Sequence, residues 1–432
     1  MKYWLEIYGC QMNFAEGYAL EGELKRRGWQ AAASAEEADV AILHTCSVRQ
    51  TAENRVWGRI GYFKHIKQDR PQKLVLMGCM AERVKEEVKK REPAIDMVVG
   101  NYSKSELPRM LERMFKDGEP GSDPLEEKPF VFQNDHAKEG DFHAYLPIMH
   151  GCNNFCSYCI VPYVRGREVS RAPEEILQEL ERLEKRGVKE ITLLGQNVNS
   201  YFYENRLRFP DILKMIIDHG SSDSWIRFLT SHPKDVPEEL IELLATEERL
   251  CRHLHLPVQH GSSTVLKRMN RKYTREEYES LVRRIRERVP EISLTTDLLI
   301  GFPGESEQDF EETLDLMRKI RFDDAYMYYF NPREGTPAAK FDDQVPHQTK
   351  LDRLAEVIEL QRRIGLENKG AKIGTIVRAL VDSVSKRNER ELQGRTEGDQ
   401  PVIFPGDRSL LGRFVELRLT AVQGGTLRAE LV

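Results

Sequence analysis

Three cysteines within eight residues constrain this chain more than any other feature of its sequence. Cys152, Cys156 and Cys159 follow the apolar run 144–149 with the spacing C-x3-C-x2-C, in a short loop that contains Gly151. Such a loop can place three thiolates around one iron–sulfur cube, and one of the four irons then lacks a protein ligand. By analogy with zinc sites, an open position indicates a metal centre that binds a substrate and does more than brace the fold.

Two alternatives stay open for this loop. A structural zinc site could use His150 as its fourth ligand, although C-x3-C-x2-C is not a usual zinc spacing. Disulfides would need an oxidising compartment. Residues 1–6 lack a charged-then-apolar signal pattern, and no apolar run approaches the roughly 20 residues that cross a bilayer. We therefore expect a cytoplasmic protein with no membrane segment.

A second set of three cysteines lies in residues 1–117, where apolar runs alternate with helix-like segments. This alternation predicts an open parallel α/β sheet. The expected strands are 3–8, 40–43, 73–77 and 95–99. Cys10, Cys46 and Cys79 follow the first three strands, at the edge where such sheets bind ligands. One cysteine there is usually a small buried hydrophobe. Three at equivalent positions predict one site, either an iron–sulfur cluster or a three-cysteine zinc site.

The remaining chain divides into three parts. With 432 residues, the protein is expected to form two or three domains. Residues 118–137 are rich in Gly and Pro and predict a linker. Residues 138–368 contain six expected strands, nearly all followed by helices, which indicates a partial (β/α)6 barrel with its site on the loops after the strands. Residues 371–432 contain four short strands divided by turns and predict a small β-barrel. Cys251 has no neighbour at metal spacing and is expected to be structural.

The cysteine strings resemble a known family. Cys152, Cys156 and Cys159, with Tyr158 before the last, resemble the radical S-adenosylmethionine (SAM) signature. The surrounding string 151–168 resembles the methylthiotransferase branch, and residues 9–13 look most like its members that act on N6-isopentenyladenosine beside the tRNA anticodon. Strings 385–387 and 392–396 resemble a TRAM domain. The resemblance covers essentially the whole chain, in matching domain order.

The resemblance implies two 4Fe-4S clusters and SAM as cofactors. An auxiliary cluster would be held by the cysteines at 10, 46 and 79, and the radical SAM cluster by those at 152, 156 and 159. Gly195 and Gln196 match the segment that contacts the SAM amino group. Further expected contacts to SAM or substrate are Tyr158, Ser231, Gln259, Asp297 and residues 301–305.

The implied activity is the insertion of sulfur at C2 of N6-isopentenyladenosine-37 in tRNA, followed by methylation. Adenine C2–H is not acidic, so a side-chain base cannot activate it and a SAM-derived radical is needed. The implied partners are the tRNA anticodon stem-loop and a low-potential electron donor such as flavodoxin or ferredoxin, with the protein a monomer. Expected RNA contacts are Arg165, Arg167, Lys386, Arg387 and Arg395, with Arg171 a further candidate.

Other functions stay open. A sister methylthiotransferase acts on threonylcarbamoyladenosine or on a ribosomal-protein aspartate, and an iron–sulfur protein could bind RNA without chemistry. The chain also departs from the expected family pattern at several positions. His44 stands in place of an asparagine, His260 in place of a serine, and Asn331 and Glu334 in place of Ser and Pro. We expect these departures to change hydrogen bonds around the metal ligands and contacts to the substrate, and to leave the ligands themselves unchanged.

Overall fold

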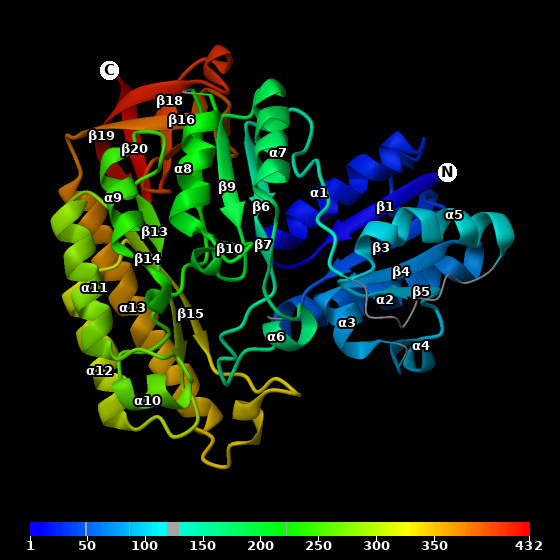
Figure 1. Cartoon of the computed structure of the whole chain (residues 1–432), viewed down its shortest axis with the longest axis horizontal. Coiled ribbons are helices and arrows are strands. Elements are labelled where there is room, and N and C mark those ends of the chain that lie inside the picture. The colour runs from blue at the N-terminus through cyan, green and yellow to red at the C-terminus, as the bar shows by residue number, and fades with distance from the viewer. Residues whose placement is uncertain (48–49, 86, 119–128, 222) are drawn as a thin grey trace.

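The computed structural model describes residues 1–47, 50–85, 87–118, 129–221 and 223–432. The N-terminal part lies on the right of Figure 1, the central core on the left, and the C-terminal barrel at the upper left. The predicted linker falls partly on residues 119–128, which lie outside the described residues. Its remaining part, residues 129–137, runs between the N-terminal part and the core. There the Phe130 ring stacks on the His150 ring with centroids 3.6 Å apart.

The N-terminal part is a parallel sheet with the strand order β2-β1-β3-β4-β5. Alternate residues of β3 point to opposite faces: Val40 and Ile42 join one apolar core, and Ala41 and Leu43 join the other. Both faces are therefore covered by helices, as predicted. The elements are β1 Lys2–Ile7, α1 Gln11–Arg26, β2 Gln30–Ala31, β3 Val40–Thr45, α2 Gln50–Asp69, β4 Lys73–Gly78, α3 Cys79–Val84, α4 Glu87–Arg91, β5 Met97–Val99 and α5 Leu107–Asp117.

One predicted helix differs from the structure. The helix expected over 81–91 is two helices, α3 and α4, and α3 already begins at Cys79. Lys85 ends α3 with φ of +44°, a left-handed conformation that interrupts the helical hydrogen bonds. The early start places Cys79 in the first turn of a helix, directly after Gly78.

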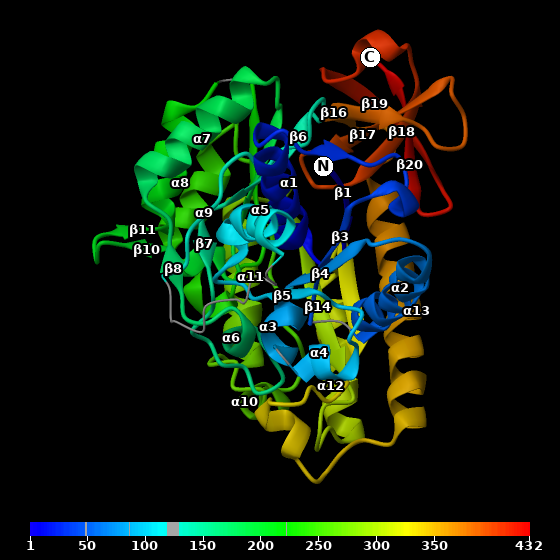
Figure 2. The same cartoon turned by 90° about the vertical axis from the view of Figure 1, so that its right-hand side faces the viewer.

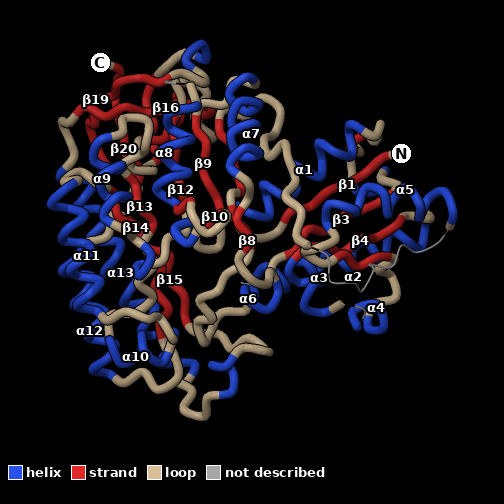
Figure 3. The backbone as a smooth tube through the Cα atoms, in the orientation of Figure 1, coloured by secondary structure: helices blue, strands red, loops and turns tan. Residues whose placement is uncertain are grey.

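The central core is an open barrel of six parallel strands within the described ranges. Two three-stranded sheets, β6-β9-β12 and β13-β14-β15, meet through a bridge between Ile226 and Leu250. Leu294, Leu298 and Ile300 of β14 pack into the main apolar core together with helices α7–α9 and α11–α13, which cover the outside of the strands (Figures 1 and 3). Thr295 and Asp297 alternate with them and face the barrel interior.

The elements of the core are β6 His143–Pro147, β7 Met149–His150, α6 Val161–Val164, β8 Val169–Ser170, α7 Pro173–Lys185, β9 Glu190–Leu194, β10 Phe202–Tyr203, β11 Leu207–Arg208, α8 Phe209–His219, β12 Trp225–Phe228, α9 Glu238–Thr246, β13 His253–His255, α10 Ser263–Arg268, α11 Arg275–Arg288, β14 Ser293–Ile300, α12 Glu307–Ile320, β15 Asp324–Tyr329 and α13 His347–Ala371. The six parallel strands of the barrel overlap the strands that the sequence predicts, which are 144–149, 189–194, 225–229, 253–258, 292–298 and 325–330.

The C-terminal part is a closed barrel with the strand order β16-β17-β18-β20-β19. Its strands are β16 Ile376–Val384, β17 Glu391–Thr396, β18 Pro401–Pro405, β19 Phe414–Gln423 and β20 Thr426–Leu431. The sequence predicts four strands and not β17. The β17 segment alternates polar Glu391, Gln393 and Arg395 with Leu392 and the inward Gly394, so it shows little apolar pattern. A Cβ on Gly394 would lie 2.9 Å from the Leu380 carbonyl oxygen, so the barrel needs glycine there.

The C-terminal barrel packs against the amino end of the central strands, beside α13 (Figures 1 and 2). Trp225 contacts Phe414 with ring centroids 4.7 Å apart, and Cys251 packs against Trp225 and Leu380. Cys251 is thus a buried structural residue, as predicted. In the described part of the chain, no helix combines the length and apolar character that a bilayer crossing requires.

Candidate functional site

The Cys152 loop is fixed by backbone contacts at its base. The Cys152 N–H donates to the Gly166 carbonyl oxygen (3.1 Å), and the Gly151 N–H donates to Gln196 Oε1 (2.6 Å). Gly151 has φ of +79°, and a Cβ there would lie 2.0 Å from the Arg167 carbonyl oxygen. Any side chain at 151 would therefore push the loop out of place. The loop presents Cys152, Cys156 and Cys159 together at the carboxyl end of the β6–β7 segment.

The chemistry around these three thiols fits an iron–sulfur cluster. Burial raises the pKa of Cys152 to about 11 and that of Cys159 to about 12, so without a metal these thiols are protonated at neutral pH. A bound metal deprotonates its thiol ligands, and the resulting negative charge needs a nearby cation. Arg271 provides one: its Nη1 lies 3.5 Å from Cys156 Sγ, and its Nη2 donates to the Pro257 carbonyl oxygen (2.8 Å). No sequence pattern indicates a role for Arg271.

The second trio lies at the carboxyl edge of the N-terminal sheet. Cys10 precedes α1, Cys46 follows β3, and Cys79 begins α3; Cys46 and Cys79 are buried. A Cβ on Gly9 would lie 2.6 Å from the Cys46 Cβ, which explains a glycine with φ of +131° beside Cys10. The three cysteines thus follow neighbouring strands β1, β3 and β4 at one edge of the sheet, and their joint binding of one cluster stays a prediction.

Two asparagines contact thiols of this trio. The Cys10 thiol donates to Asn13 Oδ1 (3.6 Å), and Asn13 Nδ2 donates to the Thr45 carbonyl oxygen next to Cys46 (2.9 Å). Asn101 Nδ2 lies 3.7 Å from Cys79 Sγ and donates to the Val164 carbonyl oxygen (2.6 Å). Asn13 belongs to the string 9–13 that carries the resemblance, whereas Asn101 had no signal in the sequence.

Both trios lie at one interface. Cys79 packs against Ile160 and Val164, and Ile160 directly follows Cys159. Cys10 packs beside Tyr145 and Leu194 of the core strands. Among the described residues, no three His, Cys, Asp or Glu side chains converge closely enough for a single metal ion. Each thiolate of a cube binds a different iron, so a cluster does not need three side chains to converge on one point.

The residues predicted to contact SAM surround the same edge of the barrel. Gln196 Oε1 holds the base of the Cys152 loop, and a Cβ on Gly195 would lie 2.4 Å from Met149 Cγ. Ser231 Oγ is buried and has no hydrogen-bond partner among the described residues. An unpartnered buried hydroxyl at this edge is suited to a bound polar ligand.

Three further predicted contacts lie nearby. Gln259 has φ of +72° and bonds through its backbone to Asp297 and Leu299 on β14. Asp297 Oδ2 lies 3.6 Å from His255 Nε2. Tyr158 packs in the apolar cluster of Phe302 and Phe330. The structure thus brings Tyr158, Gln259 and Asp297 to the carboxyl end of the barrel.

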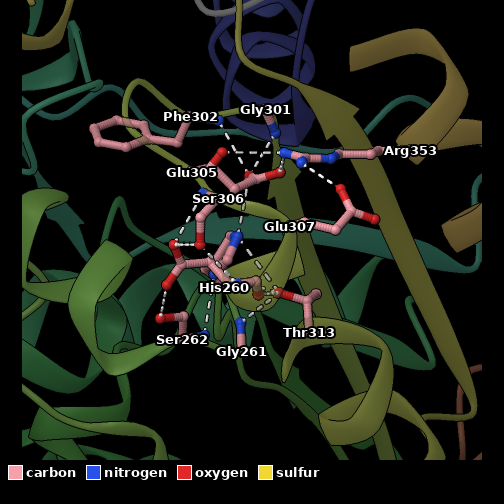
Figure 4. A network of polar contacts seen from close by, with 11 residues as sticks. His260, Gly261, Ser262, Gly301, Phe302, Glu305, Ser306, Glu307, Thr313 and Arg353 are labelled. Carbon is pink, nitrogen blue, oxygen red and sulfur yellow. Dashed lines mark hydrogen bonds and ion pairs between the residues drawn. The ribbon is translucent and has the colours of Figure 1, made fainter. Parts of the chain in front are cut away.

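Glu305 has a different role from the one expected (Figure 4). Its Oε2 accepts the N–H groups of Gly301 (2.6 Å) and Phe302 (3.2 Å), and its Oε1 pairs with Arg353 Nη1 (2.7 Å). His260 Nε2 lies 3.1 Å from the same carboxylate, and both side chains are fully buried. Glu305 therefore holds the 301–305 loop from inside, and its expected contact with SAM or substrate is wrong because its carboxylate is fully buried. His260, the departure from serine, bonds within this network.

Comparison with known proteins identifies the family. Residues 2–100 match the uncharacterized protein family UPF0004, residues 146–317 the radical SAM superfamily, and residues 370–432 the TRAM domain. Proteins named tRNA-2-methylthio-N(6)-dimethylallyladenosine synthase from Treponema pallidum (strain Nichols) and Treponema denticola are each 48% identical to this chain. These matches cover 100% of this chain and 99% and 100% of those proteins. The chain belongs to the tRNA-2-methylthio-N(6)-dimethylallyladenosine synthase family.

Solved structures agree with this fold. The radical SAM methyltransferase TsrM from Kitasatospora setae matches 78% of this chain and 75% of its own, with a TM-score of 0.58 and 16% identity. The cobalamin-dependent radical enzyme OxsB matches 84% of this chain and 56% of its own, with a TM-score of 0.51 and 15% identity. At this identity the likeness shows the fold alone. The predicted family and fold class are confirmed, as is the use of a 4Fe-4S cluster with SAM that defines the superfamily.

The residues predicted to bind RNA fall into two groups. Arg165 is only 3% exposed and donates from Nη1 to Glu16 Oε1 (2.8 Å), and Arg171 is fully buried beside Glu179. Both RNA contacts are therefore wrong, because these guanidinium groups are held inside the protein. Arg395 Nη1 pairs with Glu190 (3.6 Å) and Asp399 (3.2 Å), but its side chain is 38% exposed, so its RNA contact stays a prediction.

The other predicted RNA contacts are on the surface. Arg167 is exposed, with its guanidinium over the Phe155 ring (4.5 Å). Lys386 and Arg387 are exposed in the turn between β16 and β17. The RNA role of these three residues stays a prediction.

Proposed function

We propose that this chain inserts sulfur at C2 of N6-dimethylallyladenosine-37 in tRNA and methylates it to the 2-methylthio product. The observation that carries the proposal is the meeting of two cysteine trios at one buried interface, each with a polar or cationic neighbour suited to thiolates. A relative that matches this chain over its full length, and is named for this product, supports the substrate.

Each trio would hold one cluster. Cys152, Cys156 and Cys159 would hold the cluster that binds SAM, and Cys10, Cys46 and Cys79 the auxiliary cluster. When bound, these cofactors supply a low-potential electron, a hydrogen-abstracting radical, the transferred sulfur and a methyl group. The residues of the chain orient and enclose them. Arg271 compensates thiolate charge, Gln196 holds the Cys152 loop, and Tyr158, Gly195, Ser231, Gln259 and Asp297 would line the SAM position.

The substrate base must reach the interface between the two trios. A base that reacts at C2 cannot stay stacked, so the adenosine would be splayed out of the anticodon loop. Lys386 and Arg387 on the barrel and Arg167 beside the cysteine loop would contact the phosphate backbone. The electron donor would be a flavodoxin or ferredoxin, and the enzyme a cytoplasmic monomer. Its functional units would be residues 1–117, 138–368 and 371–432, joined by 118–137.

Two cysteine variants test this division of labour. Cys156→Ala should abolish the formation of 5′-deoxyadenosine from SAM, while the N-terminal cluster persists. Cys46→Ala should still cleave SAM but yield no methylthio product, because only the auxiliary cluster is lost. Cys251→Ala is the matched control, since that buried thiol lies in the apolar contact with Trp225 and Leu380.

The assays are iron and sulfide content, 5′-deoxyadenosine yield under reductant, and mass spectrometry of tRNA nucleosides. Wild-type product yield from Cys46→Ala would contradict the proposal. A methylthio group found on threonylcarbamoyladenosine, or on a ribosomal-protein aspartate, would favour a sister enzyme. No 5′-deoxyadenosine from fully reconstituted protein would favour an RNA-binding protein without chemistry.

A further inference from the structure

The interface between the N-terminal part and the core contains a buried group of charges. Glu16 on α1 pairs with Lys104 Nζ (2.5 Å) and with Arg165 Nη1 (2.8 Å), and these three side chains are at most 6% exposed. Arg165 Nη2 also donates to Glu16 Oε2 (3.2 Å). Arg165 comes from the core, directly after α6, and the other two come from the N-terminal part. Each part thus contributes charge to the same buried group.

The group carries more positive than negative charge. Lys104 and Arg165 are two cations, and among the described residues Glu16 is the only carboxylate that forms an ion pair with either. His44 Nε2 lies 3.3 Å from Glu16, and Arg165 Nη1 lies 3.4 Å from His150 Nδ1. A histidine adds no negative charge in either protonation state. Burying an uncompensated charge costs several kcal/mol, so an anion is expected close by.

The excess charge faces the N-terminal cysteines. Arg165 Nη2 donates to Asn13 Oδ1 (3.1 Å), and the Cys10 thiol donates to the same oxygen. On the other side, Asn101 joins Cys79 Sγ to the carbonyl oxygen of Val164, the residue before Arg165. An arginine guanidinium stays protonated in proteins, so Arg165 keeps its positive charge beside these thiols.

We infer that Arg165 and Lys104 are positioning residues for the auxiliary cluster. Their buried excess positive charge compensates the negative charge of that cluster. The inference rests on the proposed assignment of Cys10, Cys46 and Cys79 to that cluster. Charge and hydrogen bonds near a cluster set its reduction potential, since a nearby cation stabilises the more negative reduced state. The potential of the N-terminal cluster therefore depends on a residue of the core, and the two parts form one redox unit only when docked.

The test measures the midpoint potential of the auxiliary cluster alone. The parent is the full chain with Cys156→Ala, reconstituted so that only the N-terminal site holds a cluster, and the potential is read by EPR during a dye-mediated titration. Arg165→Gln and Lys104→Met each remove a buried cation and should make the potential more negative. Glu16→Gln removes the anion and should shift the potential in the opposite direction. Arg165→Lys keeps the charge and should restore most of the parent value.

Arg249→Gln is the matched control, because it removes a largely buried arginine that pairs with Glu184 away from both trios. It should leave the potential unchanged. A purely structural role would change iron content without opposite shifts for cation and anion removal. Equal potentials in all variants that retain iron, or shifts of the same sign for Lys104→Met and Glu16→Gln, would overturn the inference. No iron in the N-terminal site of the parent would instead overturn the proposed function.

Discussion

Replacing Arg227 should loosen the C-terminal barrel from the core. Arg227 on β12 is 1% exposed, and its Nη2 donates to Glu190 Oε2 (3.1 Å). Its Nη1 donates to the Glu397 carbonyl oxygen (2.8 Å) and its Nη2 to the Thr396 carbonyl oxygen (3.1 Å), both on the C-terminal barrel. One guanidinium therefore satisfies a buried carboxylate of the core and two backbone acceptors of the neighbouring barrel.

The expected cost follows from these contacts. Removing one partner of a buried ion pair costs about 3–5 kcal/mol when the other charge loses its close partner. Without Arg227, Glu190 keeps only longer contacts, with Arg395 Nη1 (3.6 Å) and His143 Nε2 (3.8 Å). The pKa of Glu190 gives a second estimate. Burial raises this pKa, but Arg227, Arg395 and His143 outweigh burial and lower it from 4.5 to about 2. A shift of that size corresponds to roughly 3 kcal/mol of favourable interaction, of which Arg227 supplies the largest charged share. Arg227→Met should therefore weaken docking by about 3–5 kcal/mol.

Hydrogen exchange of the full chain measures this loss. Amides of β17 next to Thr396 should exchange about 10²- to 4 × 10³-fold faster in Arg227→Met, because each 1.4 kcal/mol is a factor of ten in the opening equilibrium. Adding Glu190→Gln should recover much of the protection, since the buried charge is then gone. Arg252→Met, which removes a partly exposed pair with Glu397, should cost under about 1 kcal/mol. Protection in Arg227→Met within about 1 kcal/mol of wild type would refute this reasoning.

Three further outcomes are expected. Gly151→Ala should lower the iron bound at the Cys152 loop and destabilise the fold by about 1–3 kcal/mol or more, because the added Cβ would clash with the Arg167 carbonyl oxygen. Gly187→Ala is the steric control, since a Cβ there meets nothing within 4 Å. Burial raises the pKa of Glu179, but His136 and Arg171 outweigh burial and lower this pKa to about 2. The ionised Glu179 therefore contributes roughly 3 kcal/mol to the stability of the fold above pH 4.5, and this contribution is lost as the pH falls toward 2. Acid unfolding of Glu179→Gln should show a shallower loss over that range, and an identical slope would contradict the ion-pair account. Arg387→Gln should weaken tRNA binding and reduce the slope of log affinity against log salt by about one, whereas an unchanged slope would exclude a phosphate contact.

Much of the molecule follows from local sequence pattern. Strand–helix alternation predicts both α/β parts, and the cysteines at the ends of the first three strands predict a site at one sheet edge. These features are predictable because a strand and the residue that follows it are set by neighbours in sequence. The failures are also local. Strand β17 is not predicted because polar residues occupy every second position of 391–396. No sequence pattern indicates that the helix after β4 ends at Lys85.

What the amino-acid sequence determined by itself is the set of elements and the two thiol trios. Tertiary structure alone decided what surrounds them. Arg165 looks like a surface cation in the sequence, yet docking of the two parts buries it against Glu16. Arg271 and Asn101 approach the cysteines from distant segments, and Glu305 turns inward to hold its own loop. The physical reason is that burial and charge pairing depend on which faces meet, and those faces are assembled from residues far apart in the chain.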